Sequence, residues 1–154
     1  MGNIANLKNI LENNGIEFTP ITLSKTTRTA KDAAEAIGCT VSEIAKSIIF
    51  RGIDTGKPYL VIASGANRIN EASVIEQIGE PIEKANADFV KKNTGFVIGG
   101  VPPFGHCKSI ETYIDEDILI FQEIWAAAGT PYSVFKLTPL VLVRISNGKV
   151  ITIK

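Results

Sequence analysis

The sequence predicts a mixed α/β domain in which helices flank a mixed, partly closed β-sheet. Helical and strand patterns are interleaved along the chain, and several neighbouring strands are joined by tight turns, which favours a mixed sheet over a doubly wound parallel one. The chain has 154 residues, of which 45% are apolar and 21% are charged, so it can bury a sizeable core without disulfides or a metal. We therefore expect one domain over residues 1–154.

Start and stop signals mark the predicted helices. Thr29 precedes an alanine-rich run that Gly38 ends. Thr138-Pro139 places a capping residue before a proline at the first helical position. Ser42 is expected to cap a short helical turn. The predicted helices cover residues 4–11, 30–37, 70–79, 86–93 and 139–145.

Short apolar runs between turn signals predict the strands. The predicted strands cover residues 18–23, 46–50, 59–63, 109–113, 118–121 and 150–153. The turn at residues 54–58 makes the second and third strands a central hairpin. A second hairpin is expected between residues 109–113 and 118–121, with Asp115, Glu116 and Asp117 as its solvated turn.

Residues 96–106 form the most informative segment. Phe96–Ile98 is readable as a strand, and it leads into a loop with three glycines and two prolines in seven residues. Such a loop can present backbone N–H groups to an oxyanion, a carbonyl or a phosphate. No Gly-Lys-Ser/Thr follows, and prolines stand where the helix of a dinucleotide fingerprint would begin. The alternative is a rigid surface turn. If the loop serves as a site for an oxyanion, we expect it to contribute little to the core.

Composition excludes several classes of function. The formal net charge is zero, which argues against a large duplex-binding surface and therefore against DNA as a partner. Two cysteines and one histidine cannot form a structural zinc site, so we expect no metal and no cofactor. No basic-then-apolar signal or membrane-length apolar run occurs, so no membrane is expected and a reducing cytoplasm is the simplest compartment.

Several residues are candidates for chemistry. Lys46 lies where a helical turn meets a strand and can hold a carboxylate or a phosphate; the alternative is a solvated lysine. Asn67-Arg68 follow a strand and either contact a ligand or form a polar turn. Residues 125–131 combine a tryptophan with small residues, which suits either a ligand or tight packing. His106 is the only histidine, and it is either an acid–base group or structural.

Four segments in this order resemble one family. They are Glu43–Phe50, which contains Lys46; Ser64–Arg68; Gly99–His106; and Ala127–Pro131. Their order and separations are similar to those of the YbaK-type aminoacyl-tRNA deacylases, which are related to the editing domain inserted in bacterial prolyl-tRNA synthetases. The resemblance covers roughly residues 5–153.

The resemblance implies metal-independent hydrolysis, in trans, of the ester that joins a wrong amino acid to a tRNA 3′ end. Alanine, serine, threonine or cysteine on tRNA for proline would be the substrate class. Lys46 would bind the terminal adenosine or its phosphate, and the loop residues Gly99, Gly100, Val101 and Pro103 would place the ester carbonyl. The residues assigned to substrate binding are Phe50, Ser64, Asn67, Arg68, His106, Gly129 and Thr130.

An activated ester needs positioning, an oxyanion site and a water, and no protein nucleophile is evident. The unpaired acceptor end of a tRNA can be held by stacking and a few polar contacts. The zero net charge favours weak intrinsic affinity for tRNA and delivery by a synthetase partner. The alternative is a non-catalytic module that binds an aminoacyl group, a nucleotide or a synthetase.

Overall fold

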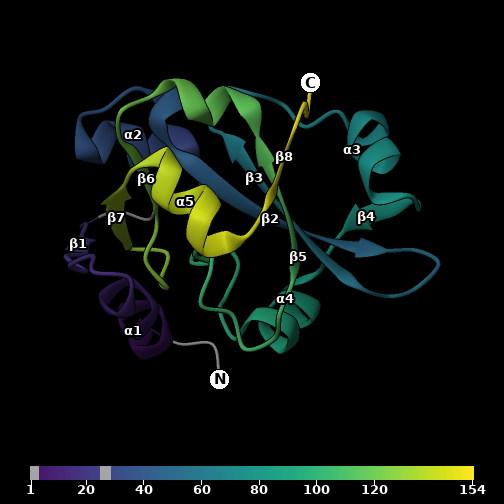
Figure 1. Cartoon of the computed structure of the whole chain (residues 1–154), viewed down its shortest axis with the longest axis horizontal. Helices are drawn as coiled ribbons and strands as arrows, with labels where there is room; N and C mark the ends of the chain where they lie inside the picture. The colour runs from purple at the N-terminus through teal and green to yellow at the C-terminus, as the bar shows by residue number, and fades with distance from the viewer. Residues whose placement is uncertain (1–3, 25–28) are drawn as a thin grey trace.

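Two β-sheets form the frame of the structure, a computed structural model that describes residues 4–24 and 29–154. The larger sheet has five strands in the order β4-β2-β3-β5-β8, and the smaller has three in the order β1-β7-β6. The strands are β1 Ile21–Thr22, β2 Ala45–Gly52, β3 Pro58–Ser64, β4 Ile82–Lys84, β5 Glu111–Asp115, β6 Ile124–Ala127, β7 Ser133–Leu137 and β8 Lys149–Ile151. Figure 1 shows the β2–β3 hairpin crossing the molecule between β7 on one side and β4 on the other.

The mixed α/β class is confirmed: β2 is antiparallel to β3 and β4, whereas β5 is parallel to β3 and β8. The expected partly closed sheet is instead two sheets that do not close. Strand β4 pairs with β2 only from Phe50 onward, and one parallel bridge, between Ile44 and Trp125, links the start of β2 to β6. Among the described residues, the edge of β2 from Ala45 to Ile48 therefore has no strand partner.

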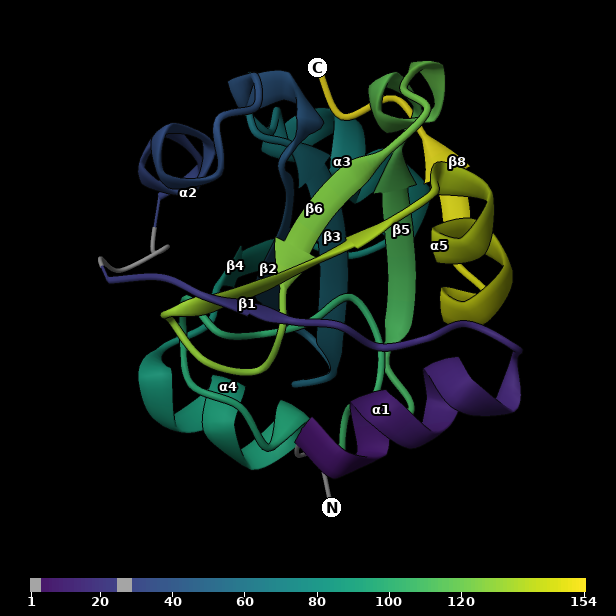
Figure 2. The ribbon, with the colours of Figure 1, turned by 90° about the vertical axis from the view of Figure 1, so that its left-hand side faces the viewer.

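The five predicted helices are confirmed as α1 Ile4–Asn13, α2 Ala30–Ile37, α3 Glu71–Ile78, α4 Ala87–Thr94 and α5 Pro139–Ser146. Their caps follow from the sequence. The Thr29 hydroxyl accepts from the Asp32 N–H at 3.1 Å, and the Thr138 hydroxyl accepts from the Val141 N–H at 3.2 Å. Figures 1 and 2 both place α1 and α4 at the same end of the molecule.

The short helical turn η1 (Val41–Glu43) begins two residues earlier than predicted, because its cap is Thr40 and not Ser42. The Glu43 carboxylate reaches back and accepts from both the N–H and the hydroxyl of Thr40, each at 2.9 Å. The turn leads directly into β2, so Lys46 does lie at a helix–strand junction.

The hairpin predicted across residues 115–117 is wrong. After β5 the chain forms a 3₁₀ helix, η2 (Glu116–Ile120). Asp115 is fully buried and accepts from the N–H groups of Ser64 at 3.0 Å and Asp117 at 2.9 Å, so it is no solvated turn residue. The Asp115 carboxylate caps the 3₁₀ helix. Because most of the predicted second strand lies in this helix, no hairpin forms with β5.

The second hairpin lies later, in β6 and β7, where the sequence pattern predicted no strands. Trp125 and Ala126 pair with Lys136 and Phe135. The segment Phe96–Ile98, which was readable as a strand, is irregular.

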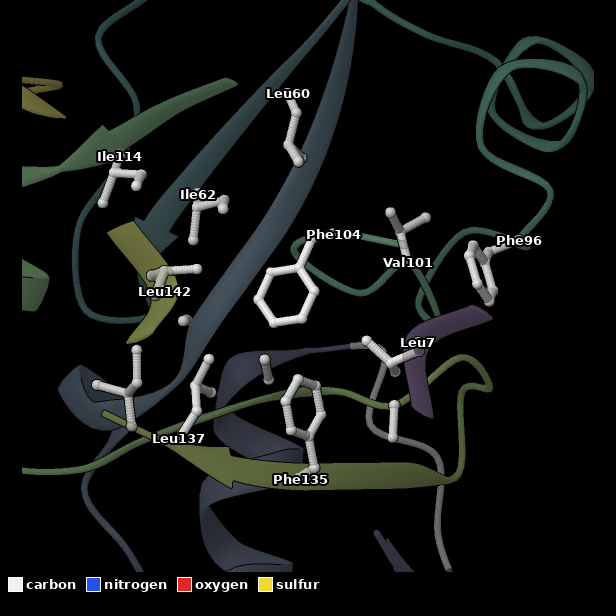
Figure 3. Packing of buried hydrophobic residues seen from close by; sticks show 14 of the residues in the cluster. Leu7, Leu60, Ile62, Phe96, Val101, Phe104, Ile114, Phe135, Leu137 and Leu142 are labelled. Atoms are coloured by element: carbon white, nitrogen blue, oxygen red, sulfur yellow. The ribbon is translucent and has the colours of Figure 1, made fainter. Parts of the chain in front are cut away.

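The main core lies between the two sheets, and the glycine–proline loop is part of it. Figure 3 shows Val101 and Phe104 of the loop pointing among Leu60, Ile62 and Phe135. Val101 and Phe104 are each 5% exposed. The expectation that this loop contributes little to the core is therefore wrong.

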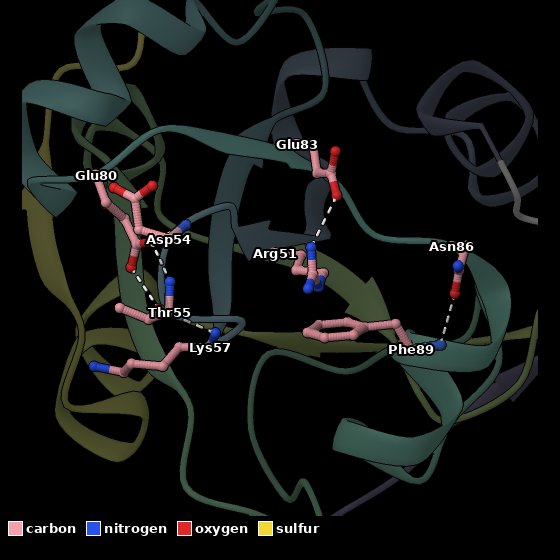
Figure 4. A network of polar contacts seen from close by, with 8 residues as sticks. All are labelled: Arg51, Asp54, Thr55, Lys57, Glu80, Glu83, Asn86 and Phe89. Carbon is pink, nitrogen blue, oxygen red and sulfur yellow. Dashed lines mark hydrogen bonds and ion pairs between the residues drawn. The ribbon is translucent and has the colours of Figure 1, made fainter.

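A buried carboxylate fixes the far end of the β2–β3 hairpin. Glu80 accepts from the N–H groups of Asp54 and Thr55, both at 3.1 Å, and from the Thr55 hydroxyl at 2.7 Å (Figure 4). The Tyr59 hydroxyl donates to the same carboxylate. Hydrogen bonds from Tyr59 and then Thr55 lower the pKa of Glu80 to about 2, and burial together with Glu80 raises the pKa of Tyr59 to about 12.

Candidate active site

A cavity of about 540 Å³ lies along the free edge of β2. It is bounded by the start of α2, by β6, by the residues after β4 and by the glycine–proline loop. Figure 2 shows β6 and β2 in this part of the molecule. A volume of this size is typical of a small-ligand site, and it exceeds what a small amino acid alone requires.

The cavity takes side chains from both faces of β2, because it wraps around an edge that no strand covers. Ala45, Ser47 and Ile49 point to one face, which we call the inner face, and Lys46 and Ile48 point to the other, the outer face. Ala45 and Ile49 belong to the main core, so the inner face lies toward the space between the sheets.

The inner part of the cavity is small and apolar. Ala126 of β6, Val134 of β7 and Val101 of the loop line it, together with Ala45 and Ile49. Short side chains leave room for a small group and limit its size.

The outer part is basic. Lys84 pairs with Phe50, and Trp125 pairs with Ile44; residues paired across strands share a face, so Lys46, Lys84 and Trp125 lie on the same outer face. Lys31 of α2 also lines the cavity. No aspartate or glutamate is among the described lining residues.

Lys46 is partly buried. Among the described residues, none forms an ion pair or a hydrogen bond with its side-chain ammonium. Burial, and secondarily the charge of Lys84, lowers the pKa of the Lys46 ammonium. Two lysines without an acidic partner beside a cavity can bind an anion, whose charge would offset both the cost of burying Lys46 and its repulsion by Lys84.

Two residues of the loop, Gly99 and Val101, line the cavity. Gly99 has φ +88°, and the N–H of neither residue has an intramolecular acceptor within residues 4–24 and 29–154. Gly100 differs from the expectation: its N–H donates to the Val97 carbonyl at 2.9 Å, so it is not a free donor. A Cβ on Gly100 would lie 2.8 Å from the Thr130 backbone, which is why glycine is needed there.

His106 holds the loop together and does not line the cavity. Its Nε2 donates to the Pro102 carbonyl at 2.7 Å, and its ring packs edge-to-face on Phe96, with centroids 6.4 Å apart. Burial lowers the pKa of His106, which keeps the imidazole neutral. Pro103 is buried in the same loop, also outside the cavity.

Gly129 and Thr130 lie in the β6–β7 turn, outside the cavity lining. The Thr130 hydroxyl bonds the Ser133 hydroxyl at 2.8 Å, and the Thr130 backbone packs on Gly100. This turn therefore supports the glycine–proline loop from behind.

The other predicted substrate-binding residues also lie outside the cavity lining. Phe50 is buried in a cluster separate from the main core, together with Tyr59 and with Val74 of α3. The Asn67 amide donates to Asp115 and Asp117, both at 2.8 Å, and Ser64 donates its hydroxyl to the Ser42 carbonyl at 2.7 Å. Arg68 is exposed.

Sequence reasoning did not assign Ser47 or Lys84 to the site, and it singled out Trp125 and Ala126 only as part of a segment. Lys84 and Trp125 reach the cavity through strand register, for which the local sequence carries no signal. The Ser47 hydroxyl is buried without a hydrogen-bond partner among the described residues.

Two absences hold for residues 4–24 and 29–154. No group of three histidine, cysteine, aspartate or glutamate side chains is placed to hold a metal ion. No helix in the same ranges is long and apolar enough to cross a membrane.

The structure is thus a mixed α/β domain whose cavity joins a basic outer part to a small apolar inner part. Comparison with known proteins specifies the class. The model of the aminoacyl-tRNA editing domain matches residues 24–145. The chain belongs to this family.

Relatives and solved structures agree with that assignment. "Uncharacterized protein YwhH" of Bacillus subtilis (strain 168) is 36% identical over 79% of this chain and 77% of its own length. "Putative Cys-tRNA(Pro)/Cys-tRNA(Cys) deacylase EbsC" of Enterococcus faecalis (strain ATCC 700802 / V583) is 25% identical over 78% of this chain and 73% of its own length. A crystal structure of "a putative trans-editing enzyme for prolyl tRNA synthetase" superposes with a TM-score of 0.89 at 39% identity, covering 98% of this chain and 96% of the other.

The predicted resemblance to the YbaK-type deacylases is thereby confirmed. The family acts on aminoacyl-tRNA, and membership implies an aminoacyl-tRNA hydrolase activity. A proline--tRNA ligase of Limosilactobacillus fermentum (strain NBRC 3956 / LMG 18251) is 29% identical over 58% of this chain, but the match covers 16% of that enzyme.

Proposed function

We propose that this protein hydrolyses, in trans, the ester of a small amino acid mischarged on tRNA, with tRNA for proline as the first candidate. One observation carries the proposal: Lys46, Gly99 and Val101 line one cavity whose inner part has short apolar side chains, and the N–H groups of Gly99 and Val101 have no acceptor among the described residues. The relative EbsC and the trans-editing structure support the same reading.

The parts have separate tasks. Lys46 on the outer face binds a backbone phosphate of the acceptor end, and the inner pocket receives the amino-acid side chain. The N–H groups of Gly99 and Val101 stabilise the oxyanion that forms as a water oxygen attacks the ester carbonyl. The carbonyl–oxygen bond to the ribose then breaks, and the ribose oxygen takes up a proton.

No protein nucleophile or base is needed for an ester of this kind, because positioning and an oxyanion site supply most of the help. The 2′-hydroxyl next to the ester is available to orient the water from the substrate side. His106 plays no part in the proton transfers, since its ring lies in the loop interior and bonds Pro102.

The inner pocket sets the substrate class. Ala45, Ala126 and Val134 limit the volume, so alanine, serine, threonine and cysteine are the expected residues. We also propose that a synthetase delivers the tRNA. The chain has no net charge and its cavity presents only three lysines among the described residues, so its own affinity for tRNA should be weak.

The test is a panel of tRNA(Pro) charged with alanine, serine, threonine, cysteine or proline, or with phenylalanine as a bulky control, and hydrolysis is followed with and without the protein. We expect release of one or more small residues and retention of a bulky control such as phenylalanine. A folded protein that binds these tRNAs but hydrolyses none would instead be a binding module. Addition of prolyl-tRNA synthetase then tests delivery.

A further inference from the structure

The outer face of the cavity combines an aromatic ring with cations. Trp125 is the one aromatic side chain among the described lining residues, and it is partly exposed. Lys46 and Lys84 share its face. Proteins that bind single-stranded nucleic acid use this combination, because bases stack on aromatic rings while cations track the backbone.

The indole also contacts a cation that lies outside the cavity lining. Lys136, its partner across β6 and β7, places its ammonium 5.9 Å from the ring centroid, and Glu123 pairs with that ammonium at 3.3 Å. Because neither Lys136 nor Glu123 lines the cavity, neither side chain competes with a base for the part of the ring that does.

The row is longer than one nucleotide requires. Trp125 lies opposite Ile44 and Lys84 lies opposite Phe50, so the two positions are six residues apart along β2. At about 3.4 Å per residue, their backbones are roughly 20 Å apart along the strand. Lys46 comes between them.

We propose that Trp125 stacks the terminal base of a single-stranded RNA 3′ end, and that Lys84 binds a second backbone phosphate beyond the one at Lys46. The inference rests on the proposed function for the identity of the ligand as RNA. It adds the base platform and the second phosphate contact, and it sets the direction of the strand, from Lys84 through Lys46 to Trp125.

The chain contains a single tryptophan, so its fluorescence reports directly on the proposed platform. The probe is an uncharged RNA oligonucleotide ending in CCA, and its control is the same oligonucleotide without the terminal base. We expect saturable quenching by the first and little quenching by the second. Binding of both without a change in emission would overturn the role of Trp125.

Variants give the energetic test, with a labelled oligonucleotide followed by anisotropy. Trp125→Leu should weaken binding by roughly 5- to 150-fold, whereas Trp125→Phe keeps an aromatic face and should stay within a few-fold of wild type. Because Trp125 also packs against a small buried cluster of Ala33, Ala34 and Ile44, circular dichroism checks that each variant is folded. Equal binding by wild type and a folded Trp125→Leu would refute the proposal.

Lys84→Gln should make the log–log salt dependence of binding shallower by about 0.7, the value for one phosphate on a single strand. The matched control is Lys92→Gln, an exposed lysine on α4 outside the cavity, which should leave the slope unchanged. Equal slopes for the two variants would remove Lys84 from the site.

The outcomes separate this inference from the proposed function. Quenching by the CCA oligonucleotide together with no hydrolysis of any aminoacyl-tRNA would remove the deacylase proposal and keep the RNA platform. Hydrolysis without quenching, or RNA binding that Trp125→Leu leaves unchanged, would remove the RNA platform and keep the deacylase proposal.

Discussion

Gly100→Ala is the sharpest test of the link between the loop and the site. An added Cβ would lie 2.8 Å from two Thr130 backbone atoms and 3.0 Å from a third, so no side chain can move aside to relieve the contact. Overpacking of this kind costs about 1–3 kcal/mol. For a chain of this length, each kcal/mol lowers the melting temperature by about 2–4 °C, which gives a fall of roughly 2–12 °C.

The same substitution should impair hydrolysis. Relief of the contact has to displace the loop, and with it the N–H groups of Gly99 and Val101. Misplacement by about 1 Å costs on the order of 10²-fold in rate. Thermal unfolding followed by circular dichroism and single-turnover hydrolysis of a mischarged tRNA measure the two effects on one preparation.

Gly15→Ala is the matched control. Gly15 has φ +76° and no atom within 4 Å of an added Cβ, so the variant loses about 1–2 kcal/mol by backbone strain alone, far from the cavity. It should be less stable and fully active. A Gly100→Ala protein that melts like wild type, or that is destabilised yet hydrolyses as well as Gly15→Ala, would refute the reasoning.

Three further predictions follow from single side chains. Lys46→Ala should lower kcat/KM roughly ten- to hundredfold with an unchanged melting temperature, as loss of one charge-assisted phosphate contact requires; wild-type kinetics would exclude this role. Glu80→Gln should lower stability at pH 7 in urea unfolding, because the amide cannot accept from all the donors that the carboxylate satisfies. The folded pKa of Glu80, about 2, lies below its ordinary 4.5, so its contribution is present above that value and is lost as the pH falls toward 2; a variant with the same acid profile as wild type would contradict this. Burial lowers the pKa of His106, so neutral His106 stabilises the fold above its ordinary 6.5, and this contribution falls as the pH drops below that value. His106→Gln should flatten this part of the stability curve without altering the pH profile of hydrolysis.

Local chemistry explains why the helices were predictable. The hydroxyls of Thr29 and Thr138 bond N–H groups three residues ahead, and Gly38 adopts a positive φ that ends α2. Each signal and its effect lie within one turn of helix, so the sequence carries both.

The β6–β7 hairpin was not predictable by the same means. Residues 124–128 are rich in alanine, which has no preference for strands, and their strand forms because Trp125 and Ala126 find partners in β7. Asp115 shows the same limit: its acceptors are filled by Ser64 and Asn67, which are about fifty residues away, so a local pattern of acids resembles a surface turn.

The residues of the site differ in the same way: some are marked by their local sequence, and others depend on distant pairing. Lys46, Gly99 and Val101 were predicted and line one cavity, and they lie in two segments that the sequence marks locally, Glu43–Phe50 and Gly99–His106. Phe50 shares a segment with Lys46 but packs in the core under α3, and Lys84 reaches the cavity only through its pairing with Phe50. Strand pairing between segments that are distant in sequence determines where these side chains lie.

The alternation of β2 has a consequence for how this site can change. Lys46 and its neighbours Ala45 and Ser47 leave opposite faces of one strand, so the spacing between the cation and the apolar pocket is fixed by covalent backbone geometry. Substitutions can widen or narrow the pocket without moving the cation. Insertion of one residue between Ala45 and Lys46 would instead place these two side chains on the same face and so disrupt the spacing between the apolar pocket and the cation.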